Sequence, residues 1–225
     1  MFVVTGFEPD RSRRGRILIL SEAGPIASVQ RRALKPLGLR EGADVDAEEL
    51  AVRIGEAEKE AAHAVALDLL SKQDYSVAEV KRRLTARGFP DDMAKAECGR
   101  LVAAGLLDDG RLARGYVDAR LAARPSGKRL LQAELARRGL DRNAIQAALA
   151  AAPRGGSTEE LELARRAADE RLRRRPATDD RDVLQREHRL LVDFLLRRGF
   201  GYQTAERAAR EALRPRGFDH SERSD

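Results

Sequence analysis

The sequence of 225 residues predicts a mainly α-helical protein, with three tandem three-helix repeats preceded by a small N-terminal segment that contains a β-hairpin. Two observations predict this fold class. One short signature, ending in an arginine, a glycine and an apolar residue, occurs at residues 84–89, 135–140 and 195–200, and such recurrence is typical of repeat architectures. Aromatic side chains make up only 4 % of the chain, which suits thin layers of packed helices better than one wide core.

The first thirty residues predict strands. Residues 15–20 are apolar and partly β-branched, residues 21–25 have the composition of a turn, and residues 25–29 are again strand-like. With residues 2–5 they predict an antiparallel unit of two or three strands, which must pack on another element because an isolated hairpin is only marginally stable. An acidic helix is expected to begin near Asp46 and to run on toward the repeats.

From about residue 60 onward, apolar residues recur at helical spacing. Each signature ends a helix-forming stretch. Another such stretch lies before that helix and a third follows the signature, so that each repeat contains three helices. Ser76 and Glu79 match a capping box, in which each side chain pairs with the other residue's backbone N–H group, and residues 157–160 repeat the pattern. The predicted segments are a hairpin with a helical linker at 1–58, repeats at 59–107, 108–152 and 153–214, and a flexible tail at 215–225.

The Arg-Gly pair of each signature has a structural and a functional interpretation. The glycine is expected to end a helix, because glycine adopts the left-handed cap conformation at little cost. A cation in the last helical turn interacts favourably with the helix dipole by about 0.3–1 kcal/mol, which is enough to explain any single arginine. Three aligned copies also fit a common binding edge, and for the set we favour that interpretation. The aligned residues are Arg87 and Gly88, Arg138 and Gly139, and Arg198 and Gly199.

The charge is unevenly distributed along the chain. The formal net charge is +6, and residues 61–152 carry 16 basic against 11 acidic side chains. Such a surplus favours a polyanionic partner, either nucleic acid or an acidic protein surface. An arginine-rich protein without such a partner is an equal alternative on charge alone.

The basic residues of the helical part supply the binding candidates. Four cations lie within ten residues at the junction of two expected helices, residues 120–129, which makes it the best candidate for a phosphate or carboxylate contact. For each residue taken singly, a solvated face is the alternative. Arg171 and residues 173–175 form a second basic group, which is a weaker binding candidate because acidic residues flank it. The candidates are Arg82, Arg83, Arg87, Arg120, Arg124, Lys128, Arg129, Arg137, Arg138, Arg197 and Arg198.

Catalytic patterns are absent from the sequence. His63, His188 and His220 lie far apart without metal-ligand spacing, and neither a phosphate-binding P-loop nor a nucleophile elbow occurs. We therefore expect a binding protein without enzymatic activity, cofactor or metal. Tyr75 and Tyr116 are interpreted as packing residues between helices and not as platforms for stacked bases.

The cellular compartment follows from two further features. Cys98 is the single cysteine, which fits a reducing compartment and predicts a buried, inert thiol. The N-terminus does not resemble a signal peptide, and no apolar run approaches the roughly 20 residues that span a bilayer. We expect a cytoplasmic protein with no membrane partner.

The motif set resembles the RecX family, whose members regulate the RecA recombinase. The resemblance covers nearly the whole chain and is most specific in residues 66–140. Leu112 stands where the family usually has an aromatic residue, and the third repeat lacks two of the motifs, which leaves the geometry of that repeat open. The matching residues are 69–76, Glu79, Leu84 and 88–89, followed by Leu101, 105–109, Ala113, Tyr116, Gly127, Leu135 and Gly139.

The resemblance implies tandem three-helix repeats behind a short β-rich segment, which agrees with the pattern-based prediction. It further implies binding in the helical groove of the RecA–DNA filament, with restraint of ATP hydrolysis, strand exchange and co-protease activity, and hence a role in DNA repair and the SOS response. Single- and double-stranded DNA are expected as weaker partners, and the free protein is expected to be monomeric. The alternatives are a stand-alone DNA-binding repeat protein that needs no RecA and a helical scaffold for another protein.

Overall fold

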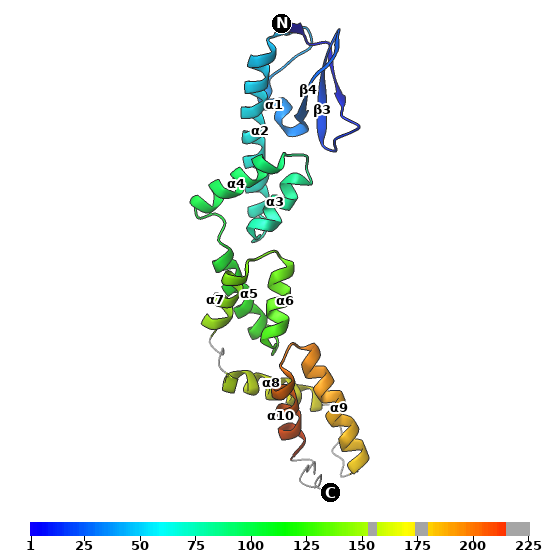
Figure 1. The fold of residues 1–225 in the computed structure, drawn as a ribbon, viewed down its shortest axis with the longest axis vertical. Helices are drawn as coiled ribbons and strands as arrows, with labels where there is room; N and C mark the ends of the chain where they lie inside the picture. The colour runs from blue at the N-terminus through cyan, green and yellow to red at the C-terminus, as the bar shows by residue number, and fades with distance from the viewer. Residues whose placement is uncertain (153–156, 174–179, 215–225) are drawn as a thin grey trace. The chain divides into compact units, whose positions relative to one another are not determined.

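The computed structural model describes residues 1–152, 157–173 and 180–214, with the backbone alone at 157 and 158. The chain forms two compact units, Met1–Asp108 and Asp109–Asp225 (Figure 1). Most described residues are helical and the strands all lie near the N-terminus, so the predicted fold class is confirmed. The capping box predicted at 157–160 and the predicted tail at 215–225 involve parts outside the described residues.

The first unit begins with two small antiparallel sheets. Strands β3 (Arg16–Ser21) and β4 (Gly24–Gln30) form the predicted hairpin, and β2 (Gly6–Pro9), which was not predicted, adds to it in the order β2-β3-β4. The prediction that residues 2–5 join this unit was wrong, because strand β1 (Phe2–Val3) pairs instead with β5 (Asp44–Val45) in the second sheet. Alternate residues of β3 are buried, because successive side chains of a strand point to opposite faces.

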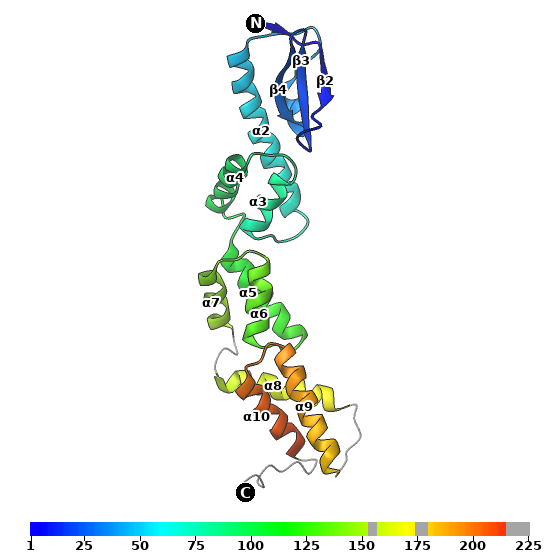
Figure 2. The same ribbon diagram turned by 45° about the vertical axis from the view of Figure 1, so that its right-hand side comes forward.

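One long helix connects this sheet to the first repeat. After a 3-10 turn (Arg31–Ala33) and α1 (Leu34–Leu37), helix α2 (Ala47–Leu70) begins at Asp46, whose carboxylate accepts hydrogen bonds from the backbone N–H groups of Glu48 and Glu49. Helix α2 lies on the β4 side of the sheet (Figure 2) and is continuous across the predicted boundary at residues 58 and 59. We keep the division of the chain into segments 1–58, 59–107, 108–152 and 153–214 as a prediction.

Helices α3 (Val77–Thr85) and α4 (Asp91–Ala103) complete the first unit. The predicted capping box is present at the start of α3: the Glu79 N–H donates to the Ser76 hydroxyl oxygen at 3.1 Å, and the Ser76 N–H donates to the Glu79 carboxylate at 2.9 Å.

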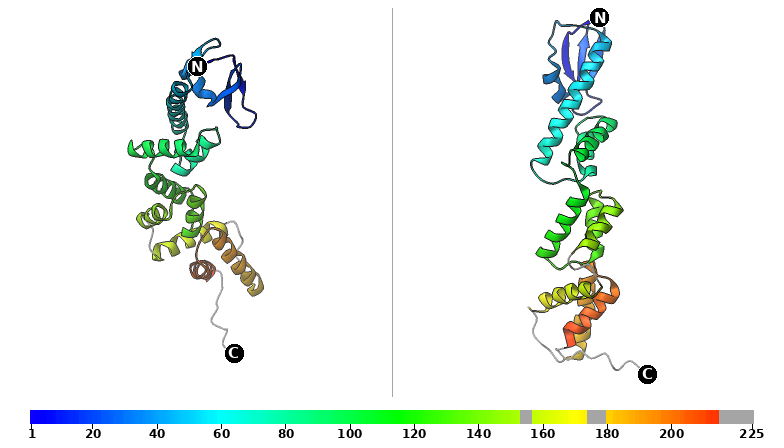
Figure 3. Two further views of the ribbon diagram at one scale, coloured as in Figure 1. Left: turned by 45° about the horizontal axis from the view of Figure 1, so that its top comes forward. Right: turned by 90° about the vertical axis from the view of Figure 1, so that its left-hand side faces the viewer.

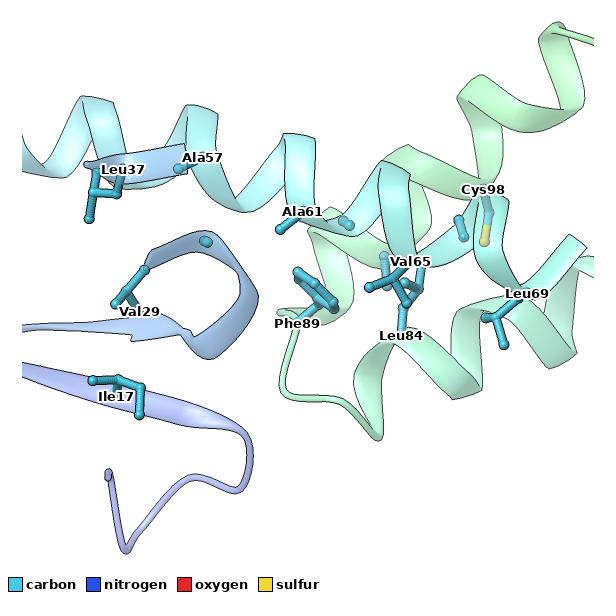
Figure 4. Close-up of a cluster of buried hydrophobic side chains, with 14 of the residues drawn as sticks. Ile17, Val29, Leu37, Ala57, Ala61, Val65, Leu69, Leu84, Phe89 and Cys98 are labelled. Carbon is cyan, nitrogen blue, oxygen red and sulfur yellow. The ribbon is translucent and has the colours of Figure 1, made fainter. Parts of the chain in front are cut away.

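The core of the first unit is continuous from the sheet to α4. Ile17 and Val29 of the sheet lie in the same cluster as Leu84 of α3 and Cys98 of α4, and Phe89 lies between the two ends of the cluster (Figure 4). The Cys98 thiol is buried, as predicted. The β segment and the first repeat therefore share one core, which provides the packing that an isolated hairpin lacks.

The second unit consists of six helices among its described residues. Two clusters of buried side chains lie in it, one within α5 to α7 and the other within α8 to α10, and Leu121 packs against both. The helices, drawn as ribbons in Figure 3, are α5 (Asp109–Ala123), α6 (Lys128–Arg137), α7 (Arg142–Ala151), α8 (Ser157–Leu172), α9 (Arg181–Arg197) and α10 (Tyr202–Leu213).

The signature glycines end helices as predicted. Gly88, Gly139 and Gly199 have φ angles of 92°, 82° and 85°, in the left-handed region that side chains with a Cβ atom rarely adopt. Each lies two or three residues after the last residue of α3, α6 or α9.

Candidate functional site

Two of the predicted basic residues, Arg83 on α3 and Arg87 just after it, have structural contacts within the first unit. The Arg83 guanidinium lies over the Tyr75 ring at 4.5 Å from its centroid, and the Arg87 side chain donates to the Arg83 carbonyl at 2.9 Å. Arg87 therefore caps its own helix, which is the structural role considered for it. Arg82 is exposed to solvent.

The signature turn of the first unit also docks on the sheet. The Arg16 guanidinium donates to the Gly88 carbonyl at 3.1 Å, and the Gln30 side-chain amide donates to the Arg87 carbonyl at 3.3 Å. Gly15, at the turn before β3, lies so close that an added Cβ would be 2.6 Å from the Arg87 carbonyl oxygen. In the first unit, the signature therefore forms a backbone turn that packs against the sheet.

The signature turn of the third repeat docks on the second repeat in the same way. Gly127 precedes α6 and its N–H donates to the Arg198 carbonyl at 2.8 Å, while the Arg129 N–H donates to the Gly199 carbonyl at 3.2 Å. These bonds satisfy two N–H groups at the start of α6, where no side chain caps the helix. The Arg198 side chain also donates to the Pro125 carbonyl at 3.1 Å.

This docking brings basic side chains from three helix ends together. The Arg171 guanidinium from α8 and the Arg198 guanidinium after α9 both lie over the Phe194 ring, at 4.7 and 4.8 Å from its centroid. Burial, together with the positive charges of Arg124 and Arg120, holds the pKa of Arg198 below its ordinary value, and Glu170 offsets part of this effect. We call Arg124, Arg171 and Arg198 the arginine cluster.

The arginine cluster joins residues that the sequence kept apart. Arg124 belongs to the predicted junction at 120–129 and Arg198 to the third signature. Arg171 belongs to the second basic group, which acidic residues flank in the sequence. Since like charges repel and guanidinium groups donate several hydrogen bonds, an anion among them relieves the repulsion and uses the donors. Arg129 is exposed and Lys128 half-buried at the start of α6, whose first turn has no acidic residue.

Arg120 differs from the rest of the junction because it is held in an internal ion pair. Its guanidinium donates to both carboxylate oxygens of Glu134 at 3.3 Å, and the Tyr116 hydroxyl donates to the same carboxylate at 2.8 Å. Burial alone would raise the pKa of Glu134, but the hydrogen bonds from Arg120 and Tyr116 hold it below its ordinary value. Tyr116 thus joins two helices, in line with its interpretation as a packing residue.

The remaining candidates lie near the C-terminal ends of α6 and α9. The Arg138 guanidinium lies 5.8 Å from the centroid of the Tyr116 ring. Arg137 and Arg197 are exposed in the last turns of α6 and α9.

Replacing Glu134 by glutamine is expected to destabilise the protein by about 1–2 kcal/mol at neutral pH, because Arg120 and Tyr116 lose a charged acceptor. The pKa of Glu134 is lowered in the folded state from 4.5, so its stabilising effect is present above that value and is lost as the pH falls through the folded-state pKa. In urea unfolding, the stabilities of the protein and the variant should therefore converge as the pH falls below the folded-state pKa of Glu134. The exposed Asp118→Asn serves as control, and a Glu134→Gln difference that persists unchanged in acid would contradict the assignment.

The described part of the chain contains neither a cluster of metal-ligating side chains nor a helix that could span a membrane. No group of three or more His, Cys, Asp or Glu side chains there could hold a metal ion. Along the same residues, every helix is too short or too polar to cross a bilayer.

Comparison with known proteins identifies the family. The regulatory protein RecX of Mycolicibacterium vanbaalenii is 38 % identical over 148 residues, covering 65 % of this chain and 79 % of that protein. The chain belongs to the RecX family. RecX of Mycobacterium tuberculosis is 37 % identical over 147 residues, covering 65 % of this chain and 83 % of that protein. Models of the first and second RecX three-helix domains match residues 62–101 and 108–149, which confirms the resemblance. The two relatives above are both named as regulatory proteins.

A solved structure agrees at the level of the fold. The crystal structure of RecX from Lactobacillus salivarius aligns with a TM-score of 0.59 and 21 % sequence identity, over 68 % of this chain and 96 % of that chain. It supports the fold of small helical domains and carries no argument about individual basic side chains.

Proposed function

We propose that this protein is a negative modulator of the RecA recombinase. It binds in the helical groove of the RecA–DNA filament and suppresses ATP hydrolysis, strand exchange and co-protease activity, and so regulates DNA repair and the SOS response. It acts in the cytoplasm as a monomer, without a cofactor. Membership of a family of regulatory proteins is the observation that carries this proposal.

The arginine cluster supplies a physical basis for the contact. Arg124 is exposed, and Arg171 and Arg198 are held over Phe194, so part of the entropy cost of ordering their long side chains is met before binding. Guanidinium groups bind both carboxylates and phosphates with two parallel hydrogen bonds. Acidic residues of the filament and DNA phosphates inside it are therefore both suitable partners.

The repeat architecture suits a helical groove. Small modules in a row can contact several filament subunits, and each further contact raises the overall affinity without one large interface. The remaining candidates, including Arg82 on α3, Arg137 at the end of α6 and Arg197 at the end of α9, would supply such secondary contacts.

Replacing Arg124, Lys128 and Arg129 together by alanine is expected to weaken inhibition of the filament about tenfold or more, because three cations of one surface are lost. The measurement is ATP turnover by RecA filaments on single-stranded DNA at increasing concentrations of this protein. A matched control removes the same charge from exposed ion pairs, by Lys59→Ala, Lys72→Ala and Arg207→Ala.

Three outcomes separate the possible failures. Unchanged ATP turnover at near-stoichiometric protein argues against the function itself. Equal effects of the triple variant and its control reject the site but leave the function. Loss of the far-UV circular dichroism of the triple variant would assign those residues to the fold.

A stand-alone DNA-binding role is the second candidate function. The basic surplus of residues 61–152 favours it. Phosphate binding predicts an affinity for DNA that falls steeply with salt concentration, because bound cations are released from the DNA. Absence of DNA binding at low salt without RecA would reject this alternative.

A further inference from the structure

A hollow of about 530 Å³ lies in the first unit between the β3–β4 turn and the first turns of α2. Its large apolar side chains are Phe2, Ile26, Leu50 and Ile54, and alanine, glycine, serine and proline residues line the rest. Well-packed interiors leave few voids larger than a water molecule, whereas volumes of this size are typical of ligand sites. The hollow opens to solvent, since Phe2 is 37 % exposed and Ala51 is exposed.

The free edge of β4 borders this hollow. All of residues 1–108 are described, and within them β4 pairs only with β3. Four consecutive residues, 24–27, line the hollow. The register between β3 and β4 shifts here, since Ile19 pairs with Ala27 and Leu20 pairs with Pro25. This irregularity interrupts the alternation of side chains between faces, so consecutive residues can line one space.

The two ends of β4 differ in how this edge is covered. At the end nearer the first repeat, the Gln30 N–H donates to the buried Glu58 carboxylate at 2.7 Å, which closes the edge against α2. At the other end, α2 offers small residues, Ala47 and Ala51, one turn apart on the side that lines the hollow. The sheet and α2 are therefore joined at the Gln30 end of β4. At the Gly24 end, they leave room for another chain.

The segments around the hollow are acidic. Residues 17–30 and 41–52 carry six acidic and no basic side chains, although the whole chain has a net charge of +6. Glu22 and Glu48 are exposed next to the lining residues Ala23 and Ala47. A bound segment with lysine or arginine beside an apolar side chain would complement this rim.

We propose that this hollow is a docking site for an extended segment of a partner protein, one that presents a large apolar side chain flanked by basic residues. The segment adds to the free edge of β4 through backbone hydrogen bonds, and its apolar side chain enters the hollow. The acidic rim repels nucleic acid, and it also disfavours a second copy that would bring the same acidic segments. The site lies in the first unit and does not depend on the arginine cluster or on the function proposed for it.

The test uses the capped peptide Lys-Arg-Val-Trp-Val-Arg-Lys with the full-length protein. The protein contains no tryptophan, so fluorescence reports only the environment of the peptide's indole ring. Binding is expected to shift the emission to shorter wavelength in a saturable manner. A peptide with glutamate in place of lysine and arginine should bind about tenfold more weakly or not at all.

Two neighbouring substitutions on α2 form a matched pair. Ala51→Phe fills the hollow and is expected to weaken peptide binding about tenfold or more. Val52→Phe adds a similar apolar group at a position that is 67 % exposed and outside the lining, so its effect should stay below about twofold. Both sites are exposed, so both variants should fold, and thermal unfolding checks this directly.

A charge variant keeps the proposal open to refutation if Ala51→Phe should misfold. Glu22→Lys with Glu48→Lys is expected to weaken the basic peptide and to strengthen the acidic one. The proposal is overturned if the basic peptide shows no shift at millimolar protein, if Ala51→Phe and Val52→Phe act alike, or if both peptides bind equally. Dimerisation in analytical ultracentrifugation that Ala51→Phe abolishes would overturn it as well, by assigning the hollow to a second copy.

Discussion

Replacing Gly127 by alanine is expected to destabilise the second unit by about 2–4 kcal/mol, because the added methyl group has no space. A Cβ atom there would lie 2.2 Å from both the carbonyl carbon and the carbonyl oxygen of Gly199. These are backbone atoms, so they can move away only by breaking the hydrogen bonds that join Gly127 to Arg198 and Arg129 to Gly199. The φ angle of Gly127 is −80°, which any residue adopts, so the loss measures the contact alone.

Gly199→Ala is expected to cost at least as much, for two reasons. Its Cβ would lie 2.3 Å from the backbone nitrogen of Leu130. Its φ angle of 85° adds a conformational cost of about 1 kcal/mol. Urea unfolding measures both variants.

Gly115→Ala is the matched control within the same unit. Gly115 lies on α5, and an added Cβ would meet nothing within 4 Å. Alanine there should stabilise the helix by about 0.5–1 kcal/mol. Similar stabilities for Gly127→Ala and Gly115→Ala would show that the two signature-linked glycines are not in contact in solution.

The sequence predicted the local role of these glycines but not their partners. A glycine after a helix-forming run indicates a left-handed cap, and that inference was correct at Gly88, Gly139 and Gly199. Which backbone each turn packs against depends on contacts between residues far apart in the chain, such as Gly127 with Gly199 or Gly15 with Arg87. Such contacts leave no periodic pattern in a single sequence.

The same reasoning explains what was missed in the candidate site. Local charge density indicated the junction at 120–129, yet Arg120 is held by Glu134 on the next helix. Acidic neighbours in sequence reduced the weight given to Arg171, although in space it shares the Phe194 ring with Arg198. The spacing of Phe194 and Arg198, four residues apart and hence on one helical face, was the available signal.

Replacing Glu58 by alanine is expected to destabilise the first unit by about 3–5 kcal/mol, because it leaves the charge of Arg16 buried without its carboxylate counter-charge. The Arg16 guanidinium lies 2.8 Å from the Glu58 carboxylate, and the two side chains are only 9 % and 5 % exposed. The same carboxylate oxygen accepts the Gln30 N–H at 2.7 Å. One carboxylate therefore accepts from a buried cation and from the edge of β4. Its loss leaves the Gln30 N–H without this acceptor and leaves Arg16 with only the uncharged acceptors of Ser28 and Gly88.

Glu56→Ala is the control two residues earlier on the same helix. Glu56 pairs with Lys59 at 2.8 Å, but both side chains are largely exposed, at 70 % and 64 %, so its loss should cost less than about 1 kcal/mol. Urea unfolding at low and high salt separates the two pairs further, since salt screens exposed charges and hardly affects buried ones. A cost for Glu58→Ala as small as that of Glu56→Ala would mean that water reaches the Arg16 charge.

The double variant Arg16→Met with Glu58→Leu distinguishes the charge pair from the packing around it. If the loss in Glu58→Ala comes from an unpaired charge, removing both charges should recover a large part of it, because a buried ion pair can be replaced by apolar side chains of similar volume. Recovery should remain incomplete, since Gln30 still lacks its acceptor and Gly88 loses the Arg16 donor. The shortfall then measures how strongly this network holds the signature turn of the first repeat against the sheet.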